Sequence, residues 1–260
     1  MTKIGFIGSG NMAFALIKAM NDNNSIIASD KSKERLDFVK KETGINITLD
    51  NTKVVENSKV IFLAVKPQNI EEVLNEIKDS IKDQIIISIA AGITLNFIKS
   101  KLNYNKIVRV MPNTPCLVSE MAAGFAIGKL NDNEIKLVEE LLNSAGKAFL
   151  LKEENLDAVT GLSGSGPAFV AYLIQSLAEG GVKQGLSKDI ANELATRTTL
   201  GTAKLLIEQG MSTKELIDMV TSPNGTTHAG RQVLEKSDVK ESLIKTIEAA
   251  TKRSKELGKW

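Results

Sequence analysis

The chain has 260 residues, of which 42% are hydrophobic and 25% are charged, so it can bury a sizeable core and is long enough for two modest domains. Its 33 Lys and Arg residues nearly balance its 31 Asp and Glu residues, and the two signs are interspersed. This balance offers no basic groove to a nucleic acid and no charged face to a membrane, and we expect neither partner.

Cysteine and histidine each occur once, as Cys116 and His228. A single cysteine excludes an intramolecular disulfide and any multi-cysteine zinc site, and a single histidine removes most other metal-ligand sets, so we expect no metal site. No run of residues reaches membrane-spanning length, and no charged leader precedes the first apolar run. These features, with a cysteine usage that suits a reducing compartment, predict a cytoplasmic protein.

The first predicted strand, Lys3–Ile7, runs into a glycine turn that is followed by apolar residues at helical spacing. The turn reads G-S-G-N-M-A. In the dinucleotide-binding pattern the first glycine makes the tight turn, the second admits the pyrophosphate, and the third small residue lets the helix pack on the strand. The pattern alone matches many glycine turns, but its place after the first strand favours a nucleotide site. The predicted pyrophosphate-binding residues are Gly8, Ser9, Gly10, Asn11, Met12 and Ala13.

The second predicted strand, Ser25–Ser29, ends at Asp30, where the pattern expects an acidic residue for the adenosine ribose. Asp30 taken alone favours NAD. Lys31 and Ser32 follow at once, with further cations, and could hold a ribose 2′-phosphate, which favours NADP. Alternatively, these cations form only the solvated first turn of a helix over residues 32–42. NADP(H) is favoured, and NAD(H) remains possible.

Two apolar runs, Val60–Val65 and Ile85–Ile89, are typical of buried parallel strands, and each is followed by a helical pattern. Ligands of an open parallel sheet lie off the carboxyl ends of its strands. Residues 8–13, 64–68 and 88–92 should therefore line one crevice. The nicotinamide is expected over the small residues Ala90, Ala91 and Gly92.

Strand and helix signals continue to alternate up to Glu153. Ile107–Met111 predicts a strand that ends in the stiff sequence M-P-N-T-P, and a strand over residues 122–127 follows. A helix over residues 132–145, capped by its first residue, and a strand over residues 148–151 complete the pattern. Residues 1–153 are thus predicted to form a doubly wound, mostly parallel α/β domain of the Rossmann type.

Strand signals are lacking after residue 153, and residues 154–260 predict an all-helical second domain. The helix expected from Pro167 carries an apolar stripe that includes Tyr172 and Leu177. This stripe fits either a subunit interface or the core of its own domain, and both interpretations stay open. The predicted helices are Leu156–Leu162, Pro167–Gly185, Lys188–Gln209, Thr213–Val220 and one from Thr226 onward with a break near Ser237.

A turn before the last of these helices is the candidate substrate site. Pro223, Asn224 and Gly225 are turn formers, and Thr226 and Thr227 are natural N-cap residues. Free backbone N–H groups and the helix dipole suit a small carboxylate, and two hydroxyls stand beside it. A plain capped turn is the alternative.

Six stretches together resemble those of the pyrroline-5-carboxylate reductase family, in order and over essentially the whole chain. The resemblance implies reduction of 1-pyrroline-5-carboxylate to L-proline with NAD(P)H, the last step of proline biosynthesis. It also implies a Rossmann domain followed by a helical dimerisation domain, in homodimers or larger rings of dimers. The six stretches are G-S-G-N-M-A (8–13), V-K-P-Q (65–68), S-I-A-A-G (88–92), R-V-M-P-N-T-P (109–115), L-S-G-S-G-P-A-F (162–169) and T-S-P-N-G-T-T (221–227).

The resemblance also assigns roles to single residues. Lys31 and Ser32 would hold the adenosine ribose or its phosphate, and Asn51 would lie near the adenosine. The Thr227 hydroxyl would lie near the imine nitrogen as the catalytic group. The family usually has a glycine where this chain has Asn224, a residue that tolerates left-handed dihedrals, so the turn can survive while substrate affinity is put in doubt. Further cofactor residues would be Ala64, Val65, Lys66, Pro67 and Asn113, and the substrate carboxylate would be bound by Ser222, Pro223, Asn224, Gly225, Thr226 and Thr227.

Two other functions compete with this hypothesis. A β-hydroxyacid dehydrogenase resembles the same two-domain plan but needs a lysine and an asparagine where this chain has Val170 and Ile174. A regulatory protein could keep the nucleotide domain without turnover, which the nearly intact S-P-N-G-T-T turn argues against. His228 lies about 100° around the helix from Thr227 and is predicted to be a surface residue. Cys116 has no local histidine to activate it and is predicted to be a packed side chain.

Overall fold

The computed structural model describes residues 1–258, and its contacts divide the chain into two compact units. The first unit comprises residues 1–165 together with the segment from Ala249 onward. The second unit comprises residues 166–248. The domain boundary expected after residue 153 stays a prediction. The first compact unit extends beyond it, to Ser165.

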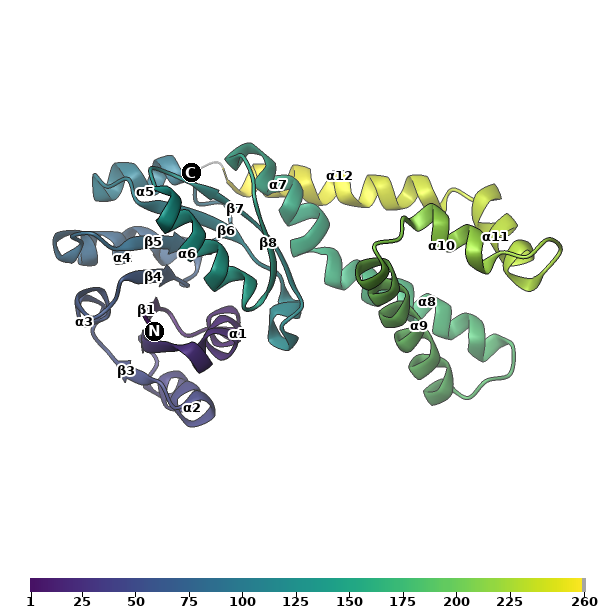
Figure 1. Cartoon of the computed structure of the whole chain (residues 1–260), viewed down its shortest axis with the longest axis horizontal. Helices are drawn as coiled ribbons and strands as arrows, with labels where there is room; N and C mark the ends of the chain where they lie inside the picture. The colour runs from purple at the N-terminus through teal and green to yellow at the C-terminus, as the bar shows by residue number, and fades with distance from the viewer. Residues whose placement is uncertain (259–260) are drawn as a thin grey trace. The chain divides into compact units, whose positions relative to one another are not determined.

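The first unit is built on one eight-stranded sheet with the order β3-β2-β1-β4-β5-β6-β7-β8 (Figure 1). Neighbouring strands from β3 to β6 are parallel, β7 is antiparallel to β6, and β8 is parallel to β7. Strand order reverses between β1 and β4, which confirms the doubly wound, mostly parallel prediction. The strands are β1 (Thr2–Ile7), β2 (Asn24–Ser29), β3 (Asn46–Thr48), β4 (Val60–Leu63), β5 (Ile85–Ser88), β6 (Ile107–Met111), β7 (Met121–Ile127) and β8 (Gly146–Leu150).

Helices cover the sheet, and the strands bury apolar side chains into two clusters. Phe6 and Phe62 stack with ring centroids 4.7 Å apart in the cluster that also holds side chains of α1, α2 and α6. Ile61, Leu63 and Ile86 belong to the other cluster, with side chains of α3, α4 and α5. Continuous apolar runs such as V-I-F-L form buried central strands because both of their faces are covered. The helices are α1 (Asn11–Met20), α2 (Lys33–Thr43), α3 (Asn51–Glu56), α4 (Ile70–Ile77), α5 (Leu95–Leu102), α6 (Asp132–Asn143) and α7 (Leu156–Val159).

Three local features differ from the sequence prediction. Strand β3 and helix α3 were not expected, because three and six residues are too few to show a periodicity. The N-cap of α6 is Asn131 and not Asp132, since the Asn131 side chain accepts from Glu134 N at 3.0 Å and completes a capping box. A π-helical turn, Thr160–Gly164, continues α7, where the sequence predicted one helix over Leu156–Leu162.

The second unit is helical, as predicted. Helices α8 and α9 lie side by side (Figure 1). The buried side chains between them are the small ones of Ala178, Ala191 and Ala195. The predicted break at Ser237 separates α11 from α12, and α12 crosses from the second unit into the first after Glu248. The helices are α8 (Gly166–Lys183), α9 (Lys188–Gln209), α10 (Thr213–Val220), α11 (Thr226–Lys236) and α12 (Val239–Leu257).

Large apolar side chains of α8 are exposed in the single chain. Tyr172 is 69% exposed and Leu177 is 62% exposed. The interpretation of this stripe as the core of its own domain is therefore wrong, because these side chains face outward from α8. Among residues 1–258, no helix is both long enough and apolar enough to cross a membrane.

Candidate nucleotide and substrate sites

The turn after β1 has the geometry of a phosphate cradle. Gly8 has a φ of 95°, and a Cβ there would lie 2.6 Å from the carbonyl oxygen of Ala64, so only glycine fits. Gly10 is the N-cap of α1, provides no side-chain cap, and has open space where a Cβ would lie. Uncapped N–H groups at a helix start, with free space before them, suit a pyrophosphate.

A pocket of about 410 Å³ opens at this turn. It lies at the carboxyl ends of β1, β2 and β4, where the strand order reverses, which is the usual ligand position in such sheets. Many residues expected to bind the cofactor line it, namely Gly8, Gly10, Asp30, Lys31, Asn51, Ala64, Val65 and Lys66. Gln68, expected in the same crevice, lines it as well, whereas Ile7, Asn69 and Val73 were not expected there.

Asp30 is engaged with the protein itself. Its Oδ2 accepts from the backbone N and the hydroxyl of Ser9 at 2.7 and 2.9 Å, and its Oδ1 accepts from Ser32 N at 2.9 Å. Burial alone would raise the pKa of Asp30, but the hydrogen bonds from Ser32 and Ser9 outweigh it, and the pKa is lowered. The carboxylate thus fastens the loop after β1 to the loop after β2.

The expected basic cluster after Asp30 is divided. Lys31 Nζ lies 3.0 Å from both carboxylate oxygens of Glu72 on α4 and lines the pocket. Arg35 points elsewhere, since its Nε donates to the carbonyl of Ser9 at 2.6 Å and its guanidinium lies over the Phe38 ring. Lys31 therefore lines the pocket while Arg35 does not, and a contact of Lys31 with a ribose phosphate stays a prediction.

Asn51 also has partners on both sides. Its Oδ1 accepts from the Ser29 hydroxyl at 2.6 Å, and its Nδ2 donates to Glu76 Oε2 at 2.7 Å. Glu72 and Glu76 were not identified from the sequence. Their spacing of four residues on a predicted helix after a crevice loop was the available signal.

Several predicted cofactor residues do not line the pocket. Ser9 is fully buried, and Ser32 caps α2 by accepting from Arg35 N at 3.2 Å. The Asn113 amide is engaged in the protein, donating to the Ser163 hydroxyl at 3.0 Å and accepting from Ala122 N at 3.0 Å. The others that the pocket does not include are Asn11, Met12, Ala13, Pro67, Ala90, Ala91 and Gly92.

The small residues after β5 have a structural use. Gly92 has a φ of 78°, and a Cβ there would lie 3.1 Å from the Leu257 carbonyl and 3.2 Å from Gly258 Cα. The end of α12 therefore fills the space beside Gly92. Ala90 is buried and Ala91 is exposed, so a role of this turn toward the nicotinamide stays a prediction.

The candidate substrate turn lies in the second unit. Gly225, and not a threonine, is the N-cap of α11, and Thr226 and Thr227 are its first helical residues. Asn224 has a φ of 60°, so it does adopt the left-handed conformation that a glycine would. Gly225 provides no side-chain cap, which leaves the first N–H groups of α11 for another acceptor.

The two reactive residue types seen in the sequence have ordinary surroundings. Cys116 is buried in the core, and burial raises the pKa of its thiol to about 11, which confirms a packed side chain. His228 Nδ1 accepts from Asn224 N at 3.3 Å, and its other ring nitrogen lies 3.3 Å from the Gln232 amide nitrogen. The imidazole thus braces its own turn.

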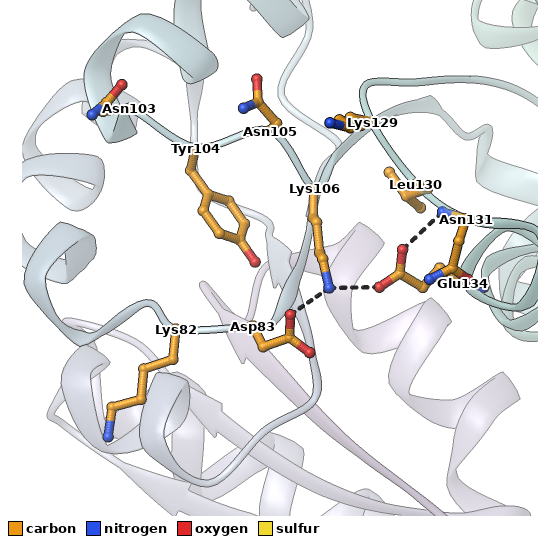
Figure 2. A pocket seen from close by; sticks show the side chains of 10 residues that line it. All are labelled: Lys82, Asp83, Asn103, Tyr104, Asn105, Lys106, Lys129, Leu130, Asn131 and Glu134. Carbon is orange, nitrogen blue, oxygen red and sulfur yellow. Dashed lines mark hydrogen bonds and ion pairs between the residues drawn. The ribbon is translucent and has the colours of Figure 1, made fainter.

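A different pocket of about 530 Å³ lies beside the amino ends of β5 and β6. Figure 2 shows Lys106 between Asp83 and Glu134, just before β5 and β6 begin. Hydrogen bonds to Asp83 and Glu134 raise the pKa of Lys106 above its usual value, and its one positive charge is paired with two carboxylates of the protein. The pocket is therefore away from the carboxyl ends of the strands, where ligands of such sheets bind.

Comparison with known proteins agrees with this arrangement. Residues 153–257 match a family model described as pyrroline-5-carboxylate reductase dimerisation, and residues 3–92 match one described as NADP oxidoreductase coenzyme F420-dependent. A pyrroline-5-carboxylate reductase of Methanosarcina acetivorans is 42% identical over 99% of this chain and 98% of its own length. The chain belongs to the pyrroline-5-carboxylate reductase family.

Other members of the family are similar over comparable lengths. Pyrroline-5-carboxylate reductase 1 of Bacillus subtilis is 39% identical over 98% of this chain and 89% of its own. The structure of the Coxiella burnetii reductase has a TM-score of 0.95 at 35% identity and covers 100% of this chain and 99% of its own. That of Plasmodium falciparum pyrroline carboxylate reductase, solved with NADP bound, has a TM-score of 0.86 at 33% identity and covers 99% and 98%.

Proposed function

We propose that this protein reduces the C=N bond of 1-pyrroline-5-carboxylate with NAD(P)H to give L-proline, the last step of proline biosynthesis. The observation that carries the proposal is the full-length similarity to pyrroline-5-carboxylate reductases, at 42% identity to the Methanosarcina protein. The pocket at the strand-order reversal supplies the nucleotide site that an oxidoreductase of this kind needs.

The first unit would hold the dinucleotide. Gly8 and Gly10 leave room for the pyrophosphate, and the start of α1 offers it N–H donors. Lys31 and Asn51 would meet the adenosine ribose, and Lys66 would lie along the cofactor. When bound, NAD(P)H supplies the hydride. We favour NADP(H), because Lys31 offers a cation for a 2′-phosphate, and an NADP complex is known for the Plasmodium relative.

The turn at residues 222–227 would hold the substrate. Its uncapped N–H groups suit the carboxylate of the cyclic imine, and the Thr227 hydroxyl would face the imine nitrogen. The carbon of a protonated C=N bond is already electrophilic, so the protein contributes mainly positioning and the exclusion of water. In this proposal, residues 1–153 bind the cofactor, and residues 154–260 bind the substrate and make the subunit contacts.

We further propose a homodimer, or a larger ring of dimers, in the cytoplasm. The exposed apolar face of α8, which includes Tyr172 and Leu177, would lie against a second copy. The family model that matches residues 153–257 carries dimerisation in its description, which supports this assignment.

The direct test is a nicotinamide absorbance assay with purified protein. We expect oxidation of NADPH or NADH only when 1-pyrroline-5-carboxylate is added, and proline as the product. Oxidation of a 3-hydroxy acid in its place would favour the dehydrogenase alternative. Dinucleotide binding without turnover of any of these compounds would favour a regulatory protein.

A further inference from the structure

Two acidic side chains of α4 contact the two residues placed to meet the adenosine ribose. Glu72 and Glu76 are four residues apart and therefore lie on one face of the helix. Glu72 binds the Lys31 ammonium with both carboxylate oxygens at 3.0 Å, and Glu76 accepts from the Asn51 amide at 2.7 Å. Lys31 and Asn51 both line the nucleotide pocket.

The Lys31–Glu72 pair is formed in water and is easily opened. The side chains are 71% and 65% exposed, and exposed ion pairs of this kind contribute little to stability. A ligand that offers the ammonium a better partner can therefore displace Glu72. A ribose 2′-phosphate is such a partner, because it brings up to two negative charges and three acceptor oxygens.

The same carboxylate acts differently on the two dinucleotides. Glu72 would repel the 2′-phosphate of NADPH and compete with it for Lys31. The 2′-hydroxyl of NADH carries no charge and can donate a hydrogen bond to a carboxylate. Lys31 and Glu72 thus push the preference in opposite directions.

We propose that Glu72 is a specificity-determining residue that weakens NADPH relative to NADH by holding Lys31 and opposing the 2′-phosphate. The inference rests on the proposed function only in taking the pocket as the dinucleotide site. Glu76 acts in the same direction more weakly, because its partner Asn51 carries no charge.

The test is Glu72→Gln, with the dissociation constants of NADPH and NADH measured by nicotinamide fluorescence. Removing the charge should tighten NADPH by roughly three- to tenfold and leave NADH within about twofold. The KM for NADPH should fall in parallel while kcat stays unchanged, because Glu72 does not meet the reacting atoms.

The matched control is Glu71→Gln. Glu71 lies on the same helix and pairs with Lys101, which does not line the pocket. The Glu71→Gln substitution therefore removes the same charge without freeing Lys31. Its ratio of NADPH to NADH affinity should stay within about twofold of the wild type. An equal shift in both variants would overturn the proposal, since the effect would then be one of net charge alone.

A double variant tests whether Glu72 acts through Lys31. In a Lys31→Ala background, Glu72→Gln should lose at least half of its effect on NADPH, because no ammonium remains to be released. An unchanged NADPH to NADH ratio in Glu72→Gln alone would also overturn the proposal. The dissociation constants are measured without the imine, so this test of Glu72 does not depend on catalysis. Tight dinucleotide binding together with no turnover of added 1-pyrroline-5-carboxylate would contradict the proposed function and not the role of Glu72.

Discussion

The two units of the chain bury their apolar side chains to very different extents. In the first unit Phe6, Phe62 and Phe125 are fully buried, together with long aliphatic side chains from strands and helices. In the second unit the buried hydrophobic side chains are Ala178, Ala191, Ala195 and Leu216. Leu177, Ile207 and Val233 of the second unit are each more than 60% exposed.

This difference indicates where each unit obtains its stability. Burial of apolar surface contributes about 25 cal/mol of stability per Å². The first unit obtains this contribution from its own core, whereas much of the apolar surface of the second unit stays exposed to water in the single chain. A helical segment with so thin a core needs surface from elsewhere, and a second copy of the chain is the partner that the dimerisation family model supports.

Breaking the assembly should have the largest effect. Leu177→Glu would place a charge on the exposed face of α8, where burial of an unpaired carboxylate against a second copy is costly. We expect a monomer by light scattering and loss of nearly all reductase activity. Val118→Glu makes the same kind of change at a 71% exposed apolar position of the first unit and should leave the oligomeric state unchanged.

A substitution in the core of the first unit should have a smaller effect, on the stability of this unit and not on assembly. Phe62→Ala removes a fully buried ring that stacks on Phe6 and should destabilise this unit by about 3–5 kcal/mol. Denaturant unfolding monitored at several protein concentrations is the measurement. The loss should not depend on concentration, and a concentration dependence would mean that assembly also stabilises this unit.

A change in the substrate turn should separate the tasks of the two units. Thr227→Ala should lower kcat/KM for 1-pyrroline-5-carboxylate by roughly one to two powers of ten, the value of a hydrogen bond to a charged centre. The dissociation constant of NADPH should not change. His228→Ala should cost much less, and a larger loss there would make the histidine the acid.

The smallest effect is expected at Asp30, which braces two loops of the first unit. Asp30→Asn should destabilise the protein by about 1 kcal/mol at neutral pH, discounted for partial exposure, because an amide cannot accept from Ser9 and Ser32 at both positions. The folded-state pKa of Asp30 is lowered, so its contribution is complete above the ordinary carboxyl range and is lost as the pH falls through the folded value. Urea midpoints from pH 7 to pH 3 should converge for wild type and variant.

Much of the fold was predictable because its signals are local. The V-I-F-L run gives a central strand, the glycine turn after β1 needs a positive φ, and Asn224 takes the left-handed conformation expected of it. The pairing of Lys31 with Glu72 was not predictable, since it joins side chains distant in sequence. Sequence spacing predicted that Asp30 meets the adenosine ribose, which stays a prediction, but it could not show the three hydrogen bonds that Ser9 and Ser32 donate to this carboxylate.

The course of helix α12 makes the second unit an insertion within the first. Residues 249–258 return to the first unit, where the Ser254 hydroxyl donates to Asp157 at 2.6 Å and Gly258 lies against Gly92. A ribosome makes the amino end first, so these contacts form only after all of residues 166–248 have been synthesised. The first unit can therefore be completed only after the whole second unit has been synthesised.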